Sequence, residues 1–74
     1  MEQFIANLKK IKRGVDFEKE TSLIDDGLLK SFDVIQIIGM IDREYGIDVP
    51  PSQILPDNFN SARAMWDMMQ RLED

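Results

Sequence analysis

The sequence predicts an all-α fold, a small four-helix bundle with three main helices and one short helix. Three observations predict it. Apolar residues recur at helical spacing in three segments, a proline-containing stretch leaves room for only a brief further helix, and no βαβ pattern is present. With 74 residues the chain has room for one domain, residues 1–74, with a small core and almost no strand.

The first helix is predicted near the N-terminus and is followed by Gly14. Basic residues gather toward its end, where they complement the helix dipole by typically ~0.3–1 kcal/mol each when exposed. They therefore need no nucleic-acid partner to explain them. The apolar face is Phe4, Ile5, Leu8 and Ile11, and the basic residues are Lys9, Lys10, Lys12 and Arg13.

A long ordered loop is predicted from Gly14 to Lys30, because the helical periodicity lapses there and Asp25-Asp26-Gly27 is a turn signal. Loops longer than about 12–15 residues are uncommon in compact domains and tend to be functional. Its apolar residues could pin it onto the core. They are Val15, Phe17, Leu23, Ile24, Leu28 and Leu29.

The strongest helix is predicted from about Phe32 to Tyr45, with Ser31 as its N-cap and Gly46 at its end. Asp33 in its first turn suits the helix dipole. Gly39 costs roughly 1 kcal/mol relative to alanine, which close helix packing would explain, or else a need for space beside an acyl chain or an attached arm. The apolar stripe is Val34, Ile38, Ile41 and Tyr45, widened by Ile35 and Ile37.

The remaining chain is predicted to be extended over Ile47–Pro51, to make a short helical turn at Ser52–Leu55 before Pro56, and to end in a helix capped by Asn60 or Ser61. One side of that helix carries Ala62, Met65, Trp66, Met69 and Leu72. Trp66 and the methionines Met65, Met68 and Met69 could line a pliable apolar pocket, but a core role is favoured at this spacing.

The composition excludes several functions. The chain has no cysteine and no histidine, so disulfides, thiolate metal sites and the usual general base are absent, and we expect neither an enzyme nor a metal site. The net charge of -5 argues against nucleic-acid and anionic-membrane partners. No apolar run is long enough to span a bilayer, and the N-terminus lacks the features of a signal peptide. We expect a cytoplasmic monomer.

Ser31 is the residue around which a function can be built. Taken alone, a serine before an amphipathic helix is a helix cap. An enzyme nucleophile is not expected, because no histidine exists to take its proton and Lys30 has no visible desolvating pocket.

Three segments resemble the acyl, peptidyl and D-alanyl carrier proteins, four-helix bundles modified on a serine at the start of their second helix. They are Asp26-Gly27-Leu28-Leu29-Lys30-Ser31-Phe32-Asp33-Val34, Glu44-Tyr45-Gly46-Ile47-Asp48-Val49-Pro50 and Asp57-Asn58-Phe59-Asn60-Ser61. The resemblance covers nearly the whole chain. It implies that a transferase moves 4'-phosphopantetheine from coenzyme A onto Ser31, and that loading enzymes and downstream acyl-transfer enzymes act on a thioester at its end.

The resemblance also implies that the second helix is the surface that partners recognise. Phe32 and Met40 are the candidate apolar contacts, although Phe32 could fold back onto the loop and Met40 could be an isolated surface residue. Asp33 is a candidate charged contact. Asp42 and Glu44 could add charge or simply solvate the helix.

Lys30 departs from the family pattern, because the residue before the serine is commonly aspartate. It could hinder a generic transferase, pair with the installed phosphate or mark a dedicated transferase. Gln36 and Arg43 stand where fatty-acid carriers tend to have carboxylates, which indicates a specialised pathway.

Three cargoes remain open: a fatty or polyketide acyl group, an amino acid supplied by an adenylating enzyme, or D-alanine. The run Gly27–Phe32 slightly favours the last two. The rival hypothesis is an unmodified interaction module, which binds a basic protein through the second helix and uses Ser31 only as a cap.

Overall fold

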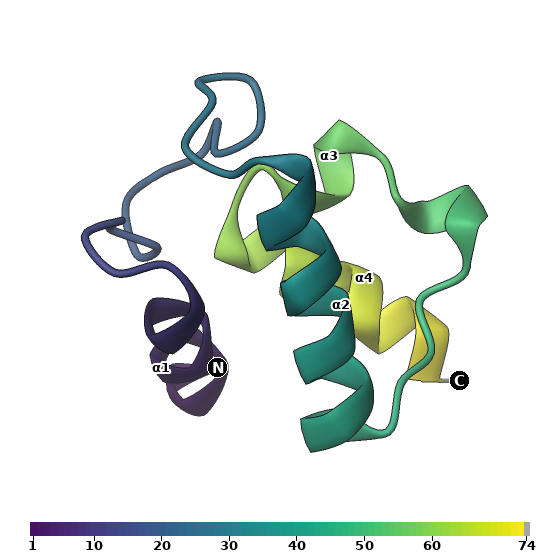
Figure 1. Ribbon diagram of the computed structural model, residues 1–74. Helices are drawn as coiled ribbons and strands as arrows, with labels where there is room; N and C mark the ends of the chain where they lie inside the picture. Colours follow the sequence, from purple (N-terminus) through teal and green to yellow (C-terminus); the bar gives the residue numbers. More distant parts are fainter. Residues whose placement is uncertain (74) are drawn as a thin grey trace.

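The computed structural model describes residues 1–73 and contains four α-helices and one 3-10 turn (Figure 1). No strand occurs within those residues, so the predicted all-α fold with a long loop after the first helix is confirmed. The helices are α1 (Glu2–Ile11), α2 (Ser31–Tyr45), α3 (Pro56–Phe59) and α4 (Ala62–Glu73), and the 3-10 turn η1 covers Pro51–Gln53. No helix in the described part of the chain is long and apolar enough to cross a membrane.

The core lies where α1 packs against both α2 and α4. Buried Phe4 packs there against two partly buried aromatic residues, its ring lying 5.9 Å from that of Tyr45 and 5.8 Å from that of Trp66, measured between centroids. Tyr45 and Trp66 are 6.4 Å apart in an edge-on arrangement. Met65, Met68 and Met69 are buried beside them, which confirms the core role predicted for the last helix.

The long loop between α1 and α2 is held in place by Asn60, in the connection between α3 and α4. Its side-chain Oδ1 accepts hydrogen bonds from the backbone N–H groups of Ile24 (2.9 Å) and Asp25 (3.1 Å). Its backbone carbonyl accepts a hydrogen bond from the backbone N–H of Leu23 at 2.8 Å. Phe17, Leu23 and Leu29 of the loop are buried, which confirms the prediction that its apolar residues attach it to the core. Ser61, the neighbour of Asn60, caps α4 by accepting the Ala64 N–H at 3.0 Å.

Burial on α2 differs from the predicted stripe. Ile37, Met40 and Ile41 are buried, whereas Val34 and Ile38 are only partly buried and Ile35 is 66% exposed. The prediction that Met40 is exposed is therefore wrong, because the helix turns its Met40 side toward the core and leaves Met40 only 2% exposed. A helix with this many apolar residues does not fix its buried face by periodicity alone, and flexible methionine fills irregular core space well.

Gly39 does not lie at a close helix contact. It is exposed, and a Cβ added there would meet nothing within 4 Å among the described residues. The packing explanation for this glycine is therefore wrong.

Prolines start the two short helical segments. Pro51 and Pro56 each occupy the first turn, where the fixed φ angle of proline fits and its missing N–H is not needed. The turn predicted at Ser52–Leu55 therefore lies slightly earlier, at Pro51–Gln53, and Pro56 begins a helix rather than ending one.

Candidate functional site

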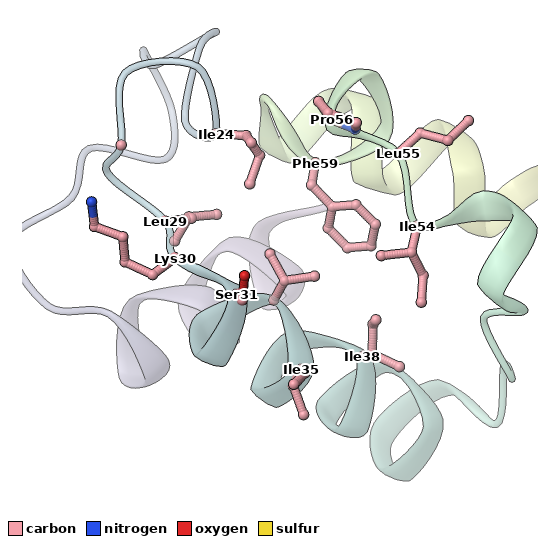
Figure 2. A pocket seen from close by; sticks show the side chains of 12 residues that line it. Ile24, Leu29, Lys30, Ser31, Ile35, Ile38, Ile54, Leu55, Pro56 and Phe59 are labelled. Atoms are coloured by element: carbon pink, nitrogen blue, oxygen red, sulfur yellow. The ribbon is translucent and has the colours of Figure 1, made fainter.

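An open groove of about 460 Å³ lies beside Ser31, between α2 and the segment that runs into α3 (Figure 2). Ser31 lies at the first turn of α2, at the mouth of the groove, and the ring of Phe59 points into it from the other side. Apart from Ser31, Lys30 and Gly27, every lining residue is apolar. These apolar residues are Ile24, Leu29, Val34, Ile35, Ile38, Ile54, Leu55, Pro56 and Phe59.

The wall opposite α2 is fixed by hydrogen bonds around Asn58. Its side chain donates to the backbone carbonyl of Gln53 at 2.8 Å, and its backbone N–H donates to the carbonyl of Leu55 at 2.9 Å. Phe59 is buried at the end of α3, which packs on α4. Ile54 and Leu55 are thereby held across from α2 without filling the groove.

The start of α2 lies one residue earlier than predicted. Lys30 is the N-cap, with extended backbone angles (φ -104°, ψ 172°), and Ser31 is the first helical residue. The prediction that Ser31 caps the helix is wrong, because the carboxylate of Asp33 accepts the Lys30 N–H at 3.0 Å and so performs the capping. Within residues 1–73 the Ser31 hydroxyl makes no cap hydrogen bond, and Ser31 is exposed.

Asp33 faces inward rather than toward a partner. It is 8% exposed, and the same oxygen that accepts the Lys30 N–H accepts a hydrogen bond from the Lys12 ammonium at 3.1 Å. The Lys30 N–H, with help from Lys12, lowers the pKa of this carboxyl, although burial opposes the shift. The predicted exposed charge at Asp33 is therefore wrong, since Lys12 compensates it inside the fold.

Phe32 is 68% exposed, so of the two alternatives that the sequence left open it is exposed and does not fold back onto the loop. Sequence reasoning missed its exposed neighbour Ile35, which had been placed in the core stripe. It also missed Ile54 and Leu55 as groove residues. Their position between Pro51 and Pro56 was the one sequence feature that could have indicated an exposed connecting segment. Three of the five exposed large apolar residues of the described chain, Ile35, Ile54 and Leu55, thus line the Ser31 groove.

Lys30 is an exposed cation at the mouth of the groove. Its Nζ lies 3.3 Å from the point where a Cβ on Gly27 would be, and Gly27 has a positive φ of 74°. No carboxylate within residues 1–73 forms an ion pair with Lys30. Lys30, Ser31 and Phe32 are therefore all exposed, and the first two line the groove. Asp33 and Met40 are buried instead.

The chain was compared with models of known protein families and with curated protein sequences, and it matches none of them.

Proposed function

We propose that the protein is a carrier that holds cargo as a thioester on a 4'-phosphopantetheine arm attached to Ser31. The observation that carries the proposal is an exposed serine hydroxyl that makes no cap hydrogen bond within residues 1–73 and lies at the edge of an apolar groove. In the attachment step, the Ser31 oxygen bonds to the phosphorus of coenzyme A that bears the pantetheine. The bond from that phosphorus to the bridging oxygen breaks, adenosine 3',5'-bisphosphate leaves with that oxygen, and the serine proton passes to the base of the transferase.

The start of α2 suits the phosphodiester that this step leaves behind. The first backbone N–H groups of a helix lack partners within the helix, and the positive end of the dipole favours an anion. Lys30, which directly precedes Ser31, is a cationic residue of the groove lining, and Lys12 pairs with the carboxylate of Asp33. A separate transferase supplies the base, so a chain without histidine remains sufficient for the carrier role.

The groove favours acyl cargo over an amino acid or D-alanine. Its walls are apolar, and no carboxylate among residues 1–73 lines it to pair with the ammonium group of an aminoacyl thioester. An apolar chain that entered the groove would remove both itself and these side chains from water. This reverses the slight preference that the sequence run around Ser31 suggested.

Intact-mass spectrometry tests the proposal. Incubation of the purified protein with coenzyme A and a broad-specificity phosphopantetheinyl transferase is expected to add one arm, about 340 Da, to the wild type. Ser31→Ala is expected to gain nothing. The control is Ser52→Ala, which removes another exposed serine at a helical start and should gain the arm like the wild type.

A second candidate, an unmodified interaction module, is favoured by the exposed side chains of Phe32 and Ile35. The same experiment separates the two candidates. If several transferases, including one encoded beside the gene, leave the wild type unmodified, the carrier proposal is wrong and the interaction module is retained.

A further inference from the structure

One carboxylate oxygen connects two segments that are far apart in the sequence. Oδ2 of Asp33 accepts the backbone N–H of Lys30 at 3.0 Å and the ammonium of Lys12 at 3.1 Å. Lys12 directly follows α1 and lies 21 residues before Asp33. Asp33 therefore joins the two ends of the long loop, Lys12 after α1 and Lys30 immediately before Ser31.

The chain offers a second ion pair for comparison. Lys9 and Glu18 are 2.9 Å apart, but their side chains are 48% and 61% exposed, so water and salt screen their attraction. The Asp33 side chain is only 11% exposed, and its pair with Lys12 is screened less. Lys12 and Lys30 are the charged groups that act on Asp33.

Without Lys12, a mostly buried carboxylate would lose the counter-charge that keeps it turned inward. Rotation of Asp33 toward water would restore its hydration, and it would release the Lys30 N–H. The backbone on the N-terminal side of Ser31 would then lose the hydrogen bond that fixes it.

We propose that Lys12 is a positioning residue for Ser31, which it holds in place through Asp33 and the Lys30 N–H. The contacts stand on their own, whereas the consequence for arm attachment rests on the proposed carrier function. Lys12 is not among the residues that line the groove, and nothing in the sequence distinguishes it from the other three basic residues near the end of α1.

The first test measures the contact without any transferase. By NMR, the Lys30 amide of Lys12→Met is expected to exchange with solvent about tenfold faster than in the wild type, because local opening becomes easier. Lys12→Arg keeps the charge and should restore the wild-type rate. Lys9→Met is the matched control, three residues earlier in the last turn of α1, and should leave the Lys30 amide unchanged. Unchanged Lys30 exchange in Lys12→Met would overturn the proposal.

Asp33→Asn provides an independent test of the role of charge. Asparagine keeps an oxygen that can accept the Lys30 N–H but loses the attraction to Lys12, so faster exchange is again expected. The double variant Lys12→Met/Asp33→Asn should exchange no faster than either single variant. Additive effects would mean that the two residues act separately, which contradicts the proposal.

The second test measures arm attachment. With the transferase and coenzyme A, Lys12→Met is expected to lower kcat/KM about fivefold, mainly through kcat, because fewer bound molecules present Ser31 in the reactive position. Lys12→Arg should restore the rate, and Lys9→Met should not change it. An effect confined to KM would assign Lys12 to direct transferase contact and overturn the positioning role.

The two proposals fail in different ways. If the wild type gains no arm, the carrier function is wrong, and the amide measurement still decides whether Lys12 fixes Lys30. If the wild type gains the arm and Lys12→Met gains it equally fast, the carrier function stands and the positioning role is wrong.

Discussion

The two ends of α2 are stabilised by different physical means. At the C-terminal end, Tyr45 packs edge-on against Phe4 and Trp66, and Gly46 closes the helix in the left-handed conformation with a φ of 66°. At the N-terminal end, one carboxylate, Asp33, holds the backbone, and the side of the helix next to it opens onto a groove.

This difference separates stability from function within a single helix. Apolar packing at the Tyr45 end does not depend on charge, whereas the Ser31 end depends on one ionised group and leaves apolar side chains in water. Functional segments are drawn from the less stable parts of a protein, because they must remain accessible or able to move.

Phe4→Ala is expected to lower the free energy of unfolding by about 3–5 kcal/mol, because it removes a fully buried ring that packs against Tyr45 and Trp66. Urea denaturation, monitored through the fluorescence of Trp66, measures this loss of unfolding free energy. Phe32→Ala is the matched control at the other end, where the ring is exposed, and should stay within about 0.5 kcal/mol of the wild type. Equal losses in the two variants would contradict the contrast between the ends.

Asp33→Ala is expected to cost about 1–3 kcal/mol at neutral pH, because the Lys30 N–H loses its acceptor and Lys12 its partner. The folded state lowers the pKa of Asp33 below its ordinary value near 3.8. The stabilisation is therefore complete above that value, and it is lost as the pH falls through the lowered pKa.

Urea denaturation at neutral and acidic pH measures this contribution as the difference between wild type and variant. Asp67→Ala serves as the control, because Asp67 pairs with Arg63 on the exposed side of α4 and should contribute about 0–1 kcal/mol. A difference for Asp33→Ala that does not shrink in acid would show that the ionised carboxylate is not what holds the start of α2.

Gly39 within α2 and Gly46 directly after it are expected to respond to alanine in opposite directions. Gly46→Ala should cost about 1–2 kcal/mol, because a Cβ is unfavourable at positive φ. Gly39→Ala should raise stability by about 0.5–1 kcal/mol, because the site is helical, exposed and free of neighbours within 4 Å in the described chain. Thermal melts of both variants compare them directly. A loss of stability in Gly39→Ala would contradict the open space found there.

The sequence was sufficient to predict the helices because their evidence is local. Apolar spacing located α1, α2 and α4, and Gly46 marked the end of α2 correctly. The rotation of α2 about its own axis is not determined by local sequence, because it depends on which other segments of the chain cover each side of the helix. Periodicity therefore placed Met40 on the surface and Ile35 in the core stripe, and the structure reverses both.

The site was predictable in position but not in its contacts. The motif located Ser31 at the start of a helix and selected Lys30 and Phe32, which are exposed beside it. The role of Asp33 could not be read from the motif, because it depends on Lys12, which only the fold brings within 3.1 Å. The groove was likewise hidden, since its two walls come from separate segments of the chain.

The smallest effect is expected for Ser31→Ala, which should change the free energy of unfolding of the unmodified protein by less than about 0.5 kcal/mol. Its hydroxyl makes no cap hydrogen bond in the described chain, so little is lost. Ser61→Ala provides the contrast: the Ser61 hydroxyl accepts the Ala64 N–H at 3.0 Å, and its removal should cost about 0.5–2 kcal/mol.

Denaturation curves of the two unmodified variants decide between the capping roles. A loss in Ser31→Ala as large as that in Ser61→Ala would mean that Ser31 caps α2 in solution and that the helix starts one residue later. With the expected small loss, the failure of Ser31→Ala to gain an arm would report the missing attachment oxygen rather than a damaged fold. The mass experiment would then test the carrier function directly.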